Sequence, residues 1–91
     1  MGTFHSDMGE LHGITVVVDT PGPEVYIGRC HEMVERGIIL HDADVHRDGE
    51  EGRSKDDYVR RAAMVGVWKK FDRLMIPRDQ IASVKKLGEV G

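Results

Sequence analysis

The sequence predicts a mainly β domain, a small and strongly bent antiparallel sheet of five strands with one helix between the third and fourth. Three observations support this class: short runs rich in β-branched and apolar residues, tight turns marked by proline and glycine, and one long charged connection. In a chain of 91 residues such a sheet closes into a partly open barrel. We therefore expect a single domain.

The first half of the chain contains three strand candidates. ITVVVDT (Ile14–Thr20) is β-branched and stops at Pro-Gly-Pro, which cannot continue a strand ladder. VYIGRCHEM (Val25–Met33) is the second candidate, and Gly28 within it indicates a bend or a close backbone approach. IILHDADVH (Ile38–His46) is the third. We interpret these three runs as strands of the antiparallel sheet.

A charged, glycine-containing loop, RDGEEGRSKDD, leads into the predicted helix. Ser54 followed three residues later by Asp57 resembles a capping box, and Gly66 is a reasonable terminator. We expect a helical insertion over about 54–66, with Ser54 to Val65 as its body. Its expected packing face consists of Tyr58, Ala62 and Val65.

Two further strands complete the predicted sheet. VWKKFDRLMI (67–76) is the fourth, Pro77-Arg78-Asp79 forms a tight turn, and IASVKKL (Ile81–Leu87) is the fifth. Trp68 and Phe71 are expected to pack the helix onto the barrel or to fill an interface. The polar stretch 1–13 is expected to form an N-terminal arm before a domain spanning 14–91.

Net charge, cysteine content and hydropathy restrict the classes of function that the chain can have. A net charge of −3 provides no overall basic field that would attract nucleic acid, so any such binding needs a local patch. The single cysteine, Cys30, excludes an intrachain disulfide and is expected to be reduced and half-buried. No apolar run reaches transmembrane length, and the N-terminus does not resemble a signal peptide. We expect a cytoplasmic protein with no membrane partner.

Metal binding and catalysis have little support. In the third strand, alternation places Asp42, Asp44 and His46 on one face, and His41, Ala43 and Val45 on the other. Neighbours on the same face lie about 7 Å apart, too far for one compact metal site. No nucleophile with a base and no phosphate-binding glycine loop is present. The sequence therefore predicts no cofactor, no metal and no enzyme activity.

Two segments together resemble the Sm and Sm-like (LSm) family. VYIGRCHEMVERGIILHDA looks like the first Sm motif: a strand bent at Gly28, a short loop from Val34 to Gly37, and an apolar strand ending in Asp42-Ala43. LMIPRDQIASVKKL resembles the second motif, in which a tight turn joins two strands. The resemblance spans roughly Ile14 to Leu87, interrupted by the predicted helix.

The resemblance implies an SH3-like (Sm-like) barrel that forms a homo-oligomeric ring of about five to seven subunits. In that family the fourth strand of one subunit pairs with the fifth strand of its neighbour, and RNA binds at loops facing the pore. The interface candidates implied here are Leu74, Met75, Ile76, Ile81, Ala82 and Val84. The RNA-binding candidates are Glu35, Arg36, Gly37 and Arg78.

The chain departs from the family at the positions that read the base. Val34 stands where the family commonly has Asp, Gly37 where it has its hallmark Asn, and Pro77-Arg78 where it has Arg-Gly. A glycine offers only its backbone to a base, whereas an asparagine amide can read a base edge. We therefore predict that the standard uridine pocket is absent, and that RNA is held by stacking and phosphate contacts.

Two hypotheses remain open, with a third more distant. The first is an Sm-like ring that binds single-stranded RNA through its pore-facing loops. The second is a structural or protein-interaction module in which the helix Ser54–Val65 is the docking surface. A monomeric SH3-like adaptor is the third. The basic pairs Arg60-Arg61, Lys69-Lys70 and Lys85-Lys86 could form a nucleic-acid face or ordinary solvated charge.

Overall fold

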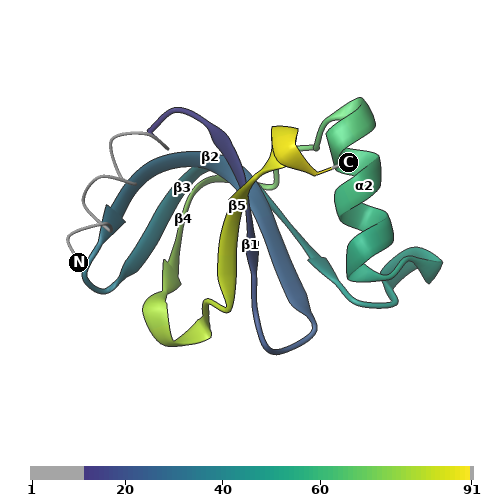
Figure 1. Ribbon diagram of the computed structural model, residues 1–91, viewed down its shortest axis with the longest axis horizontal. Helices are drawn as coiled ribbons and strands as arrows, with labels where there is room; N and C mark the ends of the chain where they lie inside the picture. Colours follow the sequence, from purple (N-terminus) through teal and green to yellow (C-terminus); the bar gives the residue numbers. More distant parts are fainter. Residues whose placement is uncertain (1–11, 91) are drawn as a thin grey trace.

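The computed structural model describes residues 12–90, which form one five-stranded antiparallel sheet with the order β4-β3-β2-β1-β5 and one helix, α2. Figure 1 shows the strands curling around a common interior, with α2 standing at one side. The strands are β1 (Thr15–Asp19), β2 (Glu24–Val34), β3 (Gly37–Arg47), β4 (Phe71–Pro77) and β5 (Ser83–Lys86), and the helix is α2 (Lys55–Val65). Short 3-10 turns are η1 (Glu50–Gly52), η2 (Arg78–Gln80) and η3 (Leu87–Glu89).

The predicted fold class, a five-stranded bent sheet with a helix between the third and fourth strands, is confirmed. The last two strands are shorter than expected. β4 begins at Phe71, so 67–70 form a connector, and β5 covers only Ser83–Lys86 because 3-10 turns occupy the chain on both sides of it. Most of the expected N-terminal arm, residues 1–11, lies outside the described residues.

Both faces of the sheet are buried. In β1, Val16 and Val18 point into the barrel, while Val17 between them packs under α2. Because successive side chains of a strand point to opposite faces of the sheet, the strand contributes residues to two separate cores rather than to one core and one solvated face. The barrel core consists of Val16, Val18, Cys30, Met33, Ile38, Leu40, Ala43 and Ile76. The second core consists of Val17, Val25, Ile27 and Ala62, with Tyr58, Val59, Val67, Leu87 and Val90 around them.

The barrel core includes the single cysteine. The expectation that Cys30 is half-buried is wrong, because its side chain is almost fully enclosed by the barrel. This burial raises the pKa of the thiol, since the thiolate would lose its hydration. Cys30 is therefore a packing residue with little thiolate character at neutral pH.

The sheet bends where β2 crosses β3. A side chain at Gly28 would place its Cβ 2.9 Å from the Cβ of Ala43 and 3.2 Å from the carbonyl oxygen of His41. Only glycine lets the two strands approach this closely. The pairing register shifts between Ile27 and Arg29, as expected for a bulge at the bend.

The same bend breaks the alternation expected in β3. Asp42 has a positive φ of 53°, so it does not share a face with Asp44 and His46 as predicted. Its carboxylate lies at the surface, where Arg29 Nη2 donates a hydrogen bond of 2.7 Å to it. Asp44 and His46 are instead buried beneath α2.

The helix begins and ends at the predicted residues. Ser54 is the N-cap, and its Oγ accepts a hydrogen bond of 3.1 Å from the backbone N–H of Asp57. Gly66, with a φ of 86°, ends the helix. Tyr58 and Ala62 face the sheet as expected, but Val65 is 69% exposed. The last turn therefore does not join the second core.

Lys55 fastens the start of α2 to the turn between β1 and β2. Its ammonium lies 2.6 Å from a carboxylate oxygen of Asp19 and donates hydrogen bonds to the carbonyl oxygens of Thr20 (2.9 Å) and Gly22 (2.8 Å). Charge-assisted contacts to a largely buried lysine are stronger than surface ion pairs. Among residues 12–90, no helix is long and apolar enough to cross a membrane.

We expect Gly28→Ala to lower the free energy of unfolding by about 1–3 kcal/mol, because the new methyl group overpacks the contact with Ala43. Gly88→Ala is the matched control, since a Cβ at Gly88 meets no atom within 4 Å. Urea unfolding of both variants measures the difference. Equal stability of the two variants would show that the bend tolerates a side chain.

Candidate functional site

The turn between β2 and β3 lies against the turn that follows β4. Glu35 and Arg36 form the first turn, and the backbone N–H of Arg78 donates a hydrogen bond of 2.7 Å to the carbonyl oxygen of Arg36. The Arg78 guanidinium donates to the carbonyl oxygen of Glu35 at 3.5 Å. The structure thus brings together all four predicted RNA-binding residues. The first loop is shorter than the expected loop from Val34 to Gly37, because Val34 belongs to β2 and Gly37 to β3.

Gly37 makes this contact between the turns possible. It pairs with Pro77 in the sheet, and a Cβ at this position would lie 2.0 Å from the carbonyl oxygen of Ile76 and 3.1 Å from the backbone nitrogen of Arg78. No side chain fits there without moving the backbone. The Sm-like family that the sequence resembles commonly has an asparagine at this position. In this structure an asparagine in place of Gly37 would separate the two turns, so the glycine has a structural reason.

The joined turns form a charged surface beside a small apolar cavity. Glu35, Arg36 and Arg78 are all exposed. Next to them lies a cavity of about 170 Å³, lined by Met33, Gly37, Ile38, Arg78, Ile81 and Val84. Arg78 lines this cavity, and Arg36 lies in the adjoining turn. Guanidinium groups so placed can bind phosphate groups next to a cavity that accepts an apolar or flat group.

The predicted interface residues lie on or beside the two edge strands. β4 pairs only with β3 and β5 only with β1 within residues 12–90, so each has one edge open for a further strand. Met75 is 42% exposed, whereas the side chain of Ile76 is buried in the barrel core and cannot contact a neighbouring copy. Leu74, Ile81 and Val84 are half-buried and pack against that core, and Ala82 is exposed.

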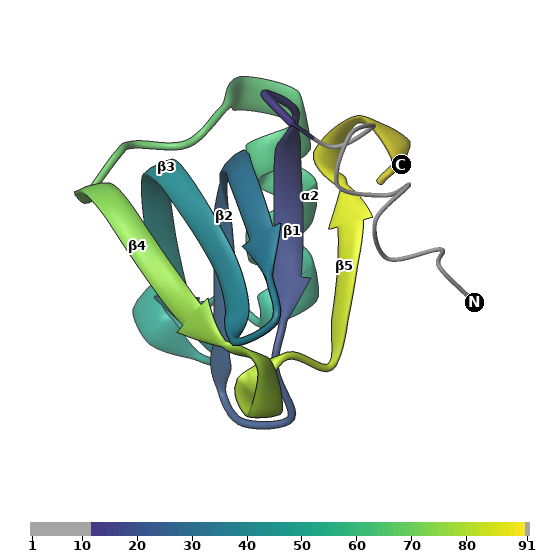
Figure 2. The same ribbon diagram turned by 90° about the vertical axis from the view of Figure 1, so that its left-hand side faces the viewer.

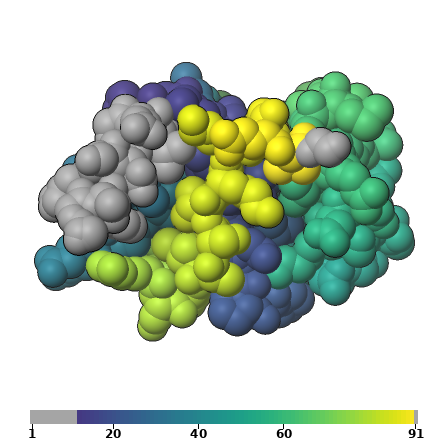
Figure 3. Space-filling view, in the orientation of Figure 1, coloured from purple at the N-terminus to yellow at the C-terminus, as the bar shows by residue number. Residues whose placement is uncertain are grey.

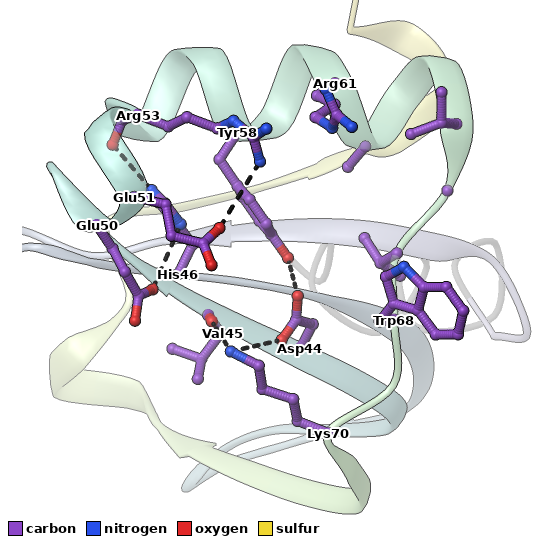
Figure 4. A pocket seen from close by; sticks show the side chains of 14 residues that line it. Asp44, Val45, His46, Glu50, Glu51, Arg53, Tyr58, Arg61, Trp68 and Lys70 are labelled. Carbon is purple, nitrogen blue, oxygen red and sulfur yellow. Dashed lines mark hydrogen bonds and ion pairs between the residues drawn. The ribbon is translucent and has the colours of Figure 1, made fainter.

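A second polar site, which sequence reasoning missed, lies between β3 and α2 (Figure 4). The Tyr58 hydroxyl from α2 donates a short hydrogen bond to Asp44 of β3. The ring of His46 stacks on Tyr58, with centroids 4.4 Å apart and planes 4° from parallel. His46 also contacts the carbonyl oxygen of Arg53 at 3.0 Å. No sequence spacing links β3 to the helix in this way.

Asp44 is the buried charge of this site. One carboxylate oxygen accepts the hydrogen bond from Tyr58. The other, Oδ1, has no hydrogen-bond partner among residues 12–90 but lies 3.4 Å from the ammonium of Lys70. Burial, together with the bond to Asp44, raises the pKa of Tyr58 well above its usual range. The phenol therefore stays neutral and donates at all physiological pH values, which suits a structural role.

The histidine and aspartate side chains of β3 do not converge. Asp42 faces solvent at the bend, Asp44 and His46 lie under α2, and His41 stacks on His31 with centroids 4.2 Å apart. Within the part of the chain that the structure describes, no group of three or more potential metal ligands gathers in one place.

We expect Tyr58→Phe to lower the free energy of unfolding at pH 7 by about 1–3 kcal/mol, since it leaves a buried carboxylate without its donor. Because folding raises the pKa of Tyr58, the hydroxyl contributes fully below about pH 10, the usual tyrosine value, and less as the pH rises above it. The difference between wild type and variant should therefore shrink in alkaline solution. Urea unfolding across that range measures it.

Tyr26→Phe is the matched control, since it removes the other tyrosine hydroxyl of the chain from a half-buried position on β2. It should change stability by less than about 0.5 kcal/mol. A Tyr58→Phe variant as stable as this control would mean that the bond to Asp44 contributes nothing net.

Comparisons with known proteins identify the fold. No family model matches the chain, and no curated protein is significantly similar to it. A novel Sm-like archaeal protein from Pyrobaculum aerophilum superimposes with a TM-score of 0.58 and 21% identity, over 89% of this chain and 48% of that one. The chain thus spans about half the length of that relative.

The second structural match is the Pyrococcus abyssii Sm protein, solved in complex with a uridine heptamer. It superimposes with a TM-score of 0.63 and 17% identity, over 90% of this chain and 94% of the other. Both matches extend over nearly the whole chain. The chain therefore has the Sm-like fold.

Proposed function

We propose that this chain is the subunit of a homo-oligomeric Sm-like ring that binds single-stranded RNA. The observation that carries the proposal is the junction of the two turns, in which the backbones of the exposed residues Arg36 and Arg78 are joined by a hydrogen bond. A ring repeats this pair in every subunit and so concentrates positive charge that a chain with a net charge of −3 otherwise lacks. The uridine heptamer bound to the Pyrococcus protein of the same fold supports RNA as the ligand.

The ring is proposed to form through the open edges of the sheet. β4 of one subunit would pair its outer edge with β5 of the next. This pairing would satisfy backbone groups on edges that no other strand within residues 12–90 covers. The interface would include Leu74 and Met75 of β4, and Val84 of β5, with Ile81 and Ala82 nearby. Such a head-to-tail contact closes into a ring when its rotation divides a full turn.

RNA recognition in this proposal relies on backbone charge rather than on a base-reading asparagine. Arg36 and Arg78 would contact phosphates, and the adjoining apolar cavity would receive part of a base. Gly37 offers only its backbone, so we expect weak discrimination between bases. We propose no catalytic role and no cofactor.

Native mass spectrometry tests the ring directly. We expect a single multiple of the 10.2 kDa chain, in the range of about five to seven copies. Single-stranded RNA of mixed sequence should add its mass to this species and dissociate as salt rises. A discrete ring that ignores RNA would favour the protein-interaction hypothesis, and a monomer would contradict the proposal.

We expect Arg36→Ala and Arg78→Ala each to weaken RNA binding and to reduce its salt dependence. Each lost phosphate contact should lower the slope of log K against log salt by about 0.7 for single strands. Arg47→Ala is the matched control, because it removes an exposed arginine at the opposite end of β3. Fluorescence anisotropy with labelled RNA measures all three variants. An equal effect of Arg47→Ala would show that only net charge matters.

A further inference from the structure

The exposed large apolar side chains are concentrated on one segment. Within the described residues, the large apolar side chains that are exposed all lie between positions 64 and 75: Met64, Val65, Trp68, Phe71 and Met75. They run from the last turn of α2, along the connector, onto the open edge of β4. Trp68 is the most exposed of them, at 88%, and Figure 4 shows it standing apart from the helix and strands. Several exposed large apolar side chains on one segment indicate an interaction surface, and the five are called the apolar stripe below.

A groove that could receive an apolar side chain lies on the opposite edge of the molecule, between α2 and β5. Its volume is about 560 Å³, and its apolar lining comes from Val17, Val25, Val59 and Val90. Figure 3 shows β5 in yellow and α2 in teal, with atoms of the strand layer visible between them. The groove is large enough for an indole ring, and its valines offer an apolar surface to it.

The directions of the edge strands bring the stripe and this groove together between copies. In Figure 2 the arrows of β4 and β5 point in opposite senses, so β4 of one copy can pair with β5 of the next in antiparallel fashion. The start of β4 then lies beside the end of β5. Trp68 precedes β4 by three residues, and Val90 follows β5 by four, so both lie at the same end of the junction.

Charged side chains surround both surfaces. Trp68 is followed by Lys69 and Lys70, whose side chains are half-exposed. The groove is lined by both acidic and basic residues: Asp19, Asp48, Asp56, Lys55, Arg60 and Lys85. Lys69 donates a hydrogen bond to Asp72, and this bond raises the pKa of Lys69, so the lysine is charged at neutral pH. Asp48 and Asp56 are the exposed groove carboxylates that could pair with the lysines of a neighbouring copy.

We propose that Trp68 of one copy inserts into the groove between α2 and β5 of the next copy. The proposal rests on the ring described above and adds a side-chain contact to the pairing of strand edges. The inserted segment supplies Trp68 and the α2 wall of the groove. The occupant of the groove is thus a second copy of this chain. The insertion between β3 and β4 would thus connect neighbouring subunits in this assembly.

Trp68 is the only tryptophan in the chain, so its intrinsic fluorescence reports this contact without a label. In a dilution series followed in parallel by sedimentation velocity, we expect its emission to shift to shorter wavelength as the protein assembles. Quenching by acrylamide should fall over the same concentration range. Trp68→Ala should raise the dissociation constant of the assembly at least about tenfold, as expected for an aromatic anchor, whereas Trp68→Phe should retain most of the affinity.

Complementation tests the head-to-tail geometry. Trp68→Ala removes the inserted side chain but keeps the groove, and Val90→Asp places a carboxylate in the groove but keeps Trp68. We expect each variant alone to assemble poorly, and an equimolar mixture to form heterodimers, because one intact contact is then available. Circular dichroism verifies folding of both variants. Asp56→Lys, at an exposed groove position, is a second groove variant that leaves the apolar core unchanged.

Two outcomes would overturn the inference while leaving the proposed ring intact. One is normal assembly of Trp68→Ala together with solvent-like emission in the wild-type assembly. The other is a fluorescence change that depends on added RNA instead of on assembly, which would make Trp68 a stacking platform. A chain that stays monomeric at all concentrations would overturn the ring and the inference together.

Discussion

The close contact of β2 and β3 at Gly28 and Ala43 is the constraint on which the rest of the structure depends. A side chain larger than hydrogen at Gly28 would collide with Ala43, so the two long strands could not cross at this distance. Their bend lets a sheet of five strands enclose one core inside and still present a flat outer region to α2. It also leaves β4 and β5 as separate open edges, and every proposed contact between copies uses them.

A second close approach, at Gly37, determines the character of the candidate RNA surface. The backbone of Gly37 lies so close to Ile76 and Arg78 that the turn between β2 and β3 and the turn after β4 become one hydrogen-bonded unit. The same tightness removes the amide side chain that reads a base in the family the sequence resembles. In the proposed RNA-binding role, Arg36 and Arg78 would supply positive charge while the turn would offer little capacity for base recognition, a combination suited to binding single strands of varied sequence.

The inserted segment gives this Sm-like fold a second layer. Lys55 anchors the start of α2 to the turn between β1 and β2, and Tyr58 holds its middle to Asp44. The end of the helix and the connector are left with apolar side chains in solvent. A helix that is firmly attached at its start and exposed at its end is well placed to pack against a neighbour.

The sequence alone determined what depends on local physics. β-branched runs defined the strands, Ser54 and Gly66 defined the ends of the helix, and Gly28 marked the bend, because each effect acts within a few residues. Only the tertiary structure decided what depends on contacts between distant segments. Three features could not be predicted from the periodicity of the sequence: the positive φ of Asp42, the burial of Asp44 under Tyr58, and the exposure of Val65 and Trp68. They follow from how the bent sheet and the helix pack.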